Sequence, residues 1–134
     1  MNDTNKRLNI QEEVTRAAEA LRAADLLYEN GFVKDAVSKL YYVLLYNIRA
    51  LLLTEGLEPK SHEGVLRLFG FYFVKTGIFD VKDSHLFSRL MKYREEADYN
   101  PSYTFLNEDF KELRNELEDA VRKITAYLKQ KGYA

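Results

Sequence analysis

Arg94 and Asp98 are the charged residues whose spacing most favours a chemical role. They lie four residues apart near the end of a long amphipathic segment, so on a helix they share one face. Phe87 and Met91 lie on the same face, so the two charges continue an apolar surface. A guanidinium matches the geometry of phosphate, and charges on an apolar surface usually pair or bind a ligand. Arg94 is therefore a candidate phosphate ligand oriented by Asp98, and the alternative is a purely structural ion pair.

Four further residues have a possible role in ligand binding. Lys60 and His62 flank Ser61 at a predicted helix start, where backbone N–H groups attract anions. His62 is also a candidate for proton transfer; the alternative is that Ser61 caps the helix and His62 packs locally. Tyr99 and Tyr103 flank a turn, where they either stack on a nucleobase or close the end of the helical domain.

The composition excludes several classes of site. The chain has no cysteine, so disulfides and thiolate metal sites are excluded, and its two histidines are a weak basis for zinc. We therefore expect neither a metal nor a cofactor. The formal net charge of −1 gives no global attraction to nucleic acid or to a membrane. The longest apolar run, residues 40–46, is too short to span a bilayer, and the N-terminus lacks a secretion signal, which predicts a soluble cytoplasmic protein.

Helical periodicity accounts for the chain, and no segment has the pattern of a strand. Residues 1–8 are predicted to be a flexible tail and residues 9–134 a single helical domain. Asn9 and Glu12 resemble a capping box that starts a helix ending before Gly31. Further helices are predicted over residues 32–55, 61–75, 83–98 and 107–131. The sequence thus predicts an all-α, up-and-down bundle of about five helices, in which 32–55 is central because apolar residues cover most of its sides.

An ordered set of short motifs resembles the HEPN domain (higher eukaryotes and prokaryotes nucleotide-binding). The motifs are GFVKDAVSKLYY from Gly31, RALLL from Arg49, KSHEGV from Lys60, FYFVKTG from Phe71 and YREEADY from Tyr93. The resemblance covers roughly residues 10–130 and is to the small single-domain type of archaea and bacteria. It implies an up-and-down helical bundle that commonly forms a homodimer. It also implies a frequent partner, a minimal nucleotidyltransferase encoded beside the HEPN protein in a toxin–antitoxin arrangement.

Many proteins of this family are metal-independent ribonucleases that use an arginine followed, after four to six residues, by a histidine. The family arginine falls on Arg94, and after four intervening residues this chain has Tyr99 in place of histidine. No histidine follows Arg94 anywhere in the sequence. A tyrosine hydroxyl ordinarily titrates near pH ~10, so it is a poor general base at neutral pH. The sequence therefore favours binding over cleavage.

Three hypotheses are compatible with these residues. In the first, the chain is a HEPN-type module that binds a nucleotide, RNA or a nucleotidyltransferase through a surface containing Arg94. In the second, it is a ribonuclease toxin that uses Arg94 together with Tyr99 or His62. In the third, it is a structural helical adaptor without a ligand. The candidate ligand-binding residues are Arg94, Asp98, Tyr99, Lys60 and His62.

Overall fold

Five α-helices and one π-helical turn make up the computed structural model, which describes residues 2–133. In chain order they are α1 (Asp3–Glu29), α2 (Val33–Thr54), α3 (His62–Phe69), η1 (Gly70–Val74), α4 (Val81–Tyr99) and α5 (Asn107–Gln130). No strand occurs between residues 2 and 133. The predicted all-α helical bundle is therefore confirmed.

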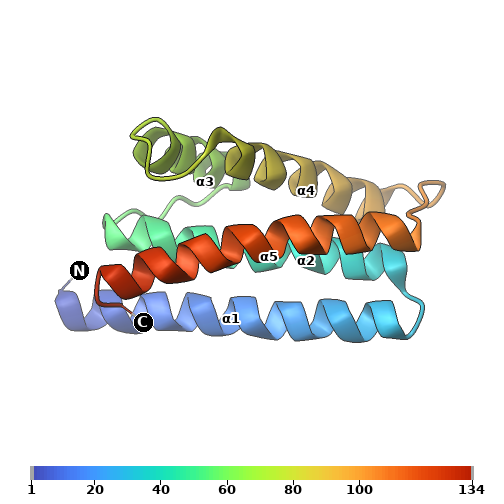
Figure 1. The fold of residues 1–134 in the computed structure, drawn as a ribbon, viewed down its shortest axis with the longest axis horizontal. Helices are drawn as coiled ribbons and strands as arrows, with labels where there is room; N and C mark the ends of the chain where they lie inside the picture. The colour runs from blue at the N-terminus through green and yellow to red at the C-terminus, as the bar shows by residue number, and fades with distance from the viewer. Residues whose placement is uncertain (1, 134) are drawn as a thin grey trace.

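The central helix is α2, as its apolar composition predicts. The helices α1, α3, α4 and α5 all pack against it. Figure 1 shows the long helices running along one common direction, with α1 on one side of α2 and α4 on the other. Among the helices of residues 2–133, α2 alone has the length and hydropathy of a membrane span, but 78% of that window is buried inside the bundle. This is the pattern of a core helix.

The start of α1 differs from the prediction, and the expected N-cap at Asn9 is wrong. The helix begins at Asp3 and is capped by Asn2, whose Oδ1 accepts a hydrogen bond from the Asn5 N–H at 2.8 Å. Residues 3–8 are consequently helical, where a flexible tail was expected; Met1 lies outside the described residues. Asparagine at either position satisfies a local capping pattern, so contacts elsewhere in the fold decide between them.

Those contacts join the first turns of α1 to segments far away in the chain. Lys6 Nζ donates a hydrogen bond to the carbonyl of Thr54 at 3.3 Å. Arg7 donates to the carbonyl of Gly132, and its guanidinium carbon lies 5.2 Å from the centroid of the Tyr133 ring. These interactions hold the first turns of α1 against the ends of α2 and α5.

The other helix ends follow their local signals. Gly31 and Gly56 adopt positive φ angles of 87° and 73° after α1 and α2, as glycine at a helix C-terminus allows. Ser61 Oγ accepts a hydrogen bond from the Gly64 N–H at 2.9 Å, which confirms the predicted cap of α3. The predicted helix over 61–75 is divided, because it widens into η1 at Gly70.

Contacts between side chains fix α4 and α5 within the bundle. Arg114 on α5 donates to both carboxylate oxygens of Asp25 on α1, at 2.7 and 2.8 Å. Lys123 Nζ on α5 lies 2.6 Å from Oδ2 of Asp83, a buried residue in the first turn of α4. The position of α4 also fixes the position of the candidate residue Arg94, which lies near the C-terminal end of this helix.

Candidate functional site

Arg94 lies over the aromatic rings of α2. Its guanidinium carbon is 5.2 Å from the centroid of the Tyr41 ring and 5.9 Å from that of Tyr42, within the range of cation–π interaction. The Arg94 side chain is only 12% exposed. Burial acts to lower the pKa of Arg94, but the neighbouring tyrosines and Asp98 outweigh it and raise that pKa above its ordinary value. The site therefore holds a permanent, largely desolvated positive charge.

The ion pair predicted between Arg94 and Asp98 is present but long. The distance from Arg94 Nη1 to Asp98 Oδ2 is 3.4 Å. The other oxygen of Asp98, Oδ1, accepts a shorter hydrogen bond of 2.9 Å from the hydroxyl of Ser38, a buried residue on α2. Asp98 thus joins the end of α4 to α2 and engages one nitrogen of the Arg94 guanidinium, while Nε of Arg94 has no hydrogen-bond partner.

Unpaired polar atoms concentrate around Arg94. The described residues contain four buried side-chain N or O atoms without a hydrogen-bond partner: Glu13 Oε2, Tyr41 Oη, Arg49 Nε and Arg94 Nε. The charges of Arg49 and Arg94 both act on the Tyr41 hydroxyl, and the charge of Arg49 acts on Glu13. A buried unpaired polar group costs about 1–3 kcal/mol, so most such groups in native proteins are paired. An anionic ligand would supply partners for the two arginine Nε–H groups among them.

The fold brings His62 to the same place. It is the first residue of α3, and its ring centroid lies 5.4 Å from that of Tyr41. Burial lowers the pKa of His62, and the positive charges of Arg94 and Arg49 lower it further. The cluster therefore favours the neutral form of the His62 imidazole, which is the form that accepts a proton. We call Tyr41, Tyr42, Arg49, His62 and Arg94 the arginine–tyrosine cluster.

The remaining predicted residues lie at different distances from this cluster. Lys60 lines a small cavity of about 180 Å³ together with Glu13 and Arg49, so it lies at the edge of the cluster. Tyr99 is 75% exposed, which excludes the alternative that its ring closes the end of the bundle, and it helps to raise the pKa of Arg94. Tyr103 instead packs on Phe105, with ring centroids 4.9 Å apart.

Three members of the cluster, Tyr41, Tyr42 and Arg49, are not among the candidate ligands predicted from the sequence, although α2 carries a signal for the last two. Tyr42, Tyr46 and Arg49 follow one another at helical spacing, so they lie on one face. Two further cations extend this face, since Lys39 Nζ is 5.9 Å from the Tyr42 ring centroid and the Arg16 guanidinium carbon is 5.8 Å from that of Tyr46. An open groove of about 1010 Å³ runs along it between α1 and α2.

The close approach of Arg94 to His62 can be tested by titration. In the Arg94→Ala variant the pKa of His62 should rise, because a positive charge that disfavours the imidazolium is removed. Proton NMR measures it directly, since the chain has only two histidines and His62→Gln assigns the signal. An unchanged pKa would show that the two side chains are further apart than the structure has them.

The same shift predicts how His62 affects stability. Its folded pKa lies below the ordinary value of 6.5, so the unfolded chain binds more protons as the pH falls through that region. His62 therefore contributes full stability above pH 6.5 and loses that contribution as the pH falls through its lowered pKa.

Among residues 2–133, no group of three or more histidine, aspartate or glutamate side chains is arranged to hold a metal ion.

Comparison with known proteins identifies the family. Residues 10–130, which contain the whole arginine–tyrosine cluster, match the HEPN domain. The Methanocaldococcus jannaschii protein named "Putative toxin MJ0142" is 33% identical over 123 residues, covering 92% of this chain and 84% of that protein. A "UPF0332 protein" of Thermotoga maritima is 36% identical over 118 residues, covering 86% and 89%. "Putative toxin MJ0605" of Methanocaldococcus jannaschii is 40% identical over 93 residues, 69% of each chain. The chain is a member of the HEPN domain family.

Proposed function

We propose that the arginine–tyrosine cluster binds the phosphate groups of a nucleotide or of RNA. The observation that carries this proposal is the buried, incompletely paired guanidinium of Arg94, placed over tyrosine rings and close enough to Arg49 for both to act on Tyr41. Guanidinium groups bind phosphate through several N–H donors at once. Because the chain as a whole is nearly neutral, this attraction is local to the cluster.

The aromatic residues beside the cluster fit a nucleic-acid ligand. Proteins that bind single-stranded nucleic acid combine cations that meet the backbone with rings on which bases stack. The exposed Tyr99 ring and the half-buried Tyr42 ring provide such surfaces beside Arg94, and the half-buried Tyr46 ring lies next to Tyr42. Asp98 then has the role of positioning Arg94, and Lys60 adds a cation at the edge.

The biological setting that we propose is a toxin–antitoxin-like pair. Two relatives carry the word toxin in their names, and the family resemblance suggests a minimal nucleotidyltransferase as the second member. In this proposal the chain acts in the cytoplasm as a homodimer. Co-purification with an adjacently encoded nucleotidyltransferase, and light scattering of the purified chain, test these two parts separately.

Ribonuclease activity is a second candidate because of the position of His62. The family histidine is missing after Arg94, but the fold places a neutral imidazole on the Tyr41 ring next to Arg94. Such an imidazole can accept the proton of an RNA 2′-hydroxyl while the guanidinium stabilises negative charge on the phosphate. His62 would then replace the missing histidine from a different helix.

The binding proposal is tested by comparing two arginine variants. Arg94→Ala should weaken the binding of a fluorescently labelled single-stranded oligoribonucleotide about tenfold, equivalent to about 1.4 kcal/mol, measured by anisotropy. The matched control is Arg122→Ala, which removes an exposed arginine on α5 outside the cluster. Circular dichroism verifies that both variants fold. If both variants lose the same amount of affinity for the oligoribonucleotide, RNA binding depends only on general surface charge and the proposed site is wrong.

A cleavage assay separates the remaining hypotheses. The oligoribonucleotide is incubated with protein and EDTA, so that only metal-independent chemistry is observed. Cleavage by the unmodified protein that disappears in His62→Gln supports the ribonuclease, whereas binding without cleavage supports the binding module. If the folded protein neither binds nor cleaves RNA or nucleotides, the structural-adaptor hypothesis is the one that remains.

A further inference from the structure

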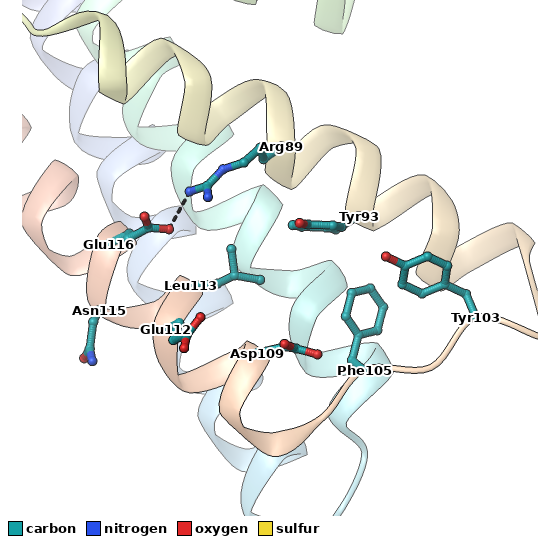
Figure 2. A pocket seen from close by; sticks show the side chains of 9 residues that line it. All are labelled: Arg89, Tyr93, Tyr103, Phe105, Asp109, Glu112, Leu113, Asn115 and Glu116. Atoms are coloured by element: carbon teal, nitrogen blue, oxygen red, sulfur yellow. Dashed lines mark hydrogen bonds and ion pairs between the residues drawn. The ribbon is translucent and has the colours of Figure 1, made fainter.

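A second cleft lies between α4 and α5, away from the arginine–tyrosine cluster. Its volume is about 450 Å³, within the range of ligand sites in proteins. Figure 2 shows the side chains that line it, with aromatic residues at one end and carboxylates along α5. Tyr93 belongs to this cleft, whereas the next residue, Arg94, lies over the α2 rings. The two sites therefore use different sides of α4.

Three rings form the aromatic end of the cleft. Tyr93 and Phe105 are perpendicular, with ring centroids 5.8 Å apart, and Tyr103 lies 4.9 Å from Phe105. Figure 2 shows them gathered where the chain leads from α4 into α5. None of the three is fully buried, so ring surface remains available to a ligand. The negative face of such a ring attracts cations.

Three carboxylates from α5 line the same cleft, and they differ in whether they have hydrogen-bond or ion-pair partners within the protein. Asp109 Oδ2 accepts a hydrogen bond from the Leu106 N–H at 2.8 Å, at the helix start. Glu116 pairs with Arg89 of α4 across the cleft, as the dashed line in Figure 2 marks. Glu112 is exposed to solvent, and within the described part of the chain no hydrogen bond or ion pair involves it. One carboxylate of the cleft is therefore unpaired.

The antiparallel helices α4 and α5 place an arginine opposite Glu116 but a tyrosine opposite Glu112. Arg89 of α4 reaches Glu116 of α5, so one of the chain's own guanidinium groups already bridges the cleft there. One helical turn further along α4 stands Tyr93, and one turn back along α5 stands Glu112. At this level the cleft offers a ring and a carboxylate but has no cation between them.

We propose that this cleft binds an arginine side chain of a partner protein. The incoming guanidinium stacks on the Tyr93 ring and pairs with Glu112, which repeats the Arg89–Glu116 pair one turn away. A planar guanidinium suits this position better than an ammonium group, because it can stack on a ring and bond to a carboxylate through two N–H groups together. The site is independent of RNA binding, since it contains no residue of the arginine–tyrosine cluster.

The test is an NMR titration of the intact protein with the blocked peptide acetyl-Gly-Arg-Gly-amide. Amide signals around Tyr93 and Glu112 should shift, and the arginine peptide should bind more tightly than its lysine counterpart or spermidine. Glu112→Gln should weaken binding about threefold, because it removes an ion pair at a solvent-exposed carboxylate. Tyr93→Leu should weaken it as well. The matched control Glu95→Gln, an exposed carboxylate on α4 outside the cleft, should leave the affinity unchanged.

The possible contrary results are distinct. If the lysine peptide or spermidine binds as tightly as the arginine peptide, the guanidinium assignment is wrong. If Glu112→Gln and Glu95→Gln weaken binding equally, the peptide responds only to surface charge and the cleft is not a site. The absence of saturable shifts also overturns the proposal. Arg94→Ala should leave this titration unchanged, so failure here is separate from failure of RNA binding.

Discussion

Replacing Phe87 with alanine should lower the free energy of unfolding by about 3–5 kcal/mol, the usual cost of removing a buried phenylalanine ring. Phe87 is fully buried on α4, and its ring stacks parallel to that of Tyr41 on α2, with centroids 5.5 Å apart. The substitution leaves a cavity between the central helix and the helix that carries Arg94. Urea denaturation followed by circular dichroism measures the change.

The same substitution reports on the candidate site, because the Tyr41 ring contacts both Phe87 and the guanidinium of Arg94. RNA binding by Phe87→Ala should therefore weaken even under conditions in which the variant is folded. Phe87→Leu is the control, since it keeps most of the volume and should cost no more than about 1.5 kcal/mol. An alanine variant as stable as the leucine variant would contradict the observed packing.

Replacing Lys123 with methionine should lower the free energy of unfolding by about 2–3 kcal/mol at pH 7. Its partner Asp83 is 5% exposed and also accepts a hydrogen bond from the Asp80 N–H at 3.2 Å. Without Lys123 this carboxylate is buried and has lost its counter-charge, which costs about 3–5 kcal/mol in fully buried pairs. The Lys123 side chain is 40% exposed, and solvent screening reduces the expected loss to the lower figure.

A double variant distinguishes the loss of charge balance from a loss of packing. Asp83→Asn combined with Lys123→Met removes both charges and should recover part of the stability lost in Lys123→Met alone. Arg122→Ala, which breaks the exposed pair with Asp119, should change the stability by less than about 1 kcal/mol. If Lys123→Met behaves like Arg122→Ala, the Asp83 pair does not fasten α4 to α5.

The predicted elements were correct where their signals were local. Ser61 caps α3 through a hydrogen bond to Gly64 only three residues away, and Gly31 ends α1 with a positive φ that glycine adopts without strain. The start of α1 could not be predicted in this way, because Asn2 and Asn9 are both acceptable caps. Contacts of Lys6 and Arg7 with distant segments favour the earlier one.

For the candidate site, the sequence by itself determined the pairing of Arg94 with Asp98, because helical spacing brings residues four apart together. Only the tertiary structure decided what surrounds that pair. Arg94 and His62 are brought to the Tyr41 ring by the packing of α4 and α3 against α2, and no local pattern encodes those distances. The same holds for Glu112, whose position opposite Tyr93 depends on how α5 packs along α4. Burial and long-range contacts, which arise only when the helices pack, thus brought separate residues together in two distinct candidate sites.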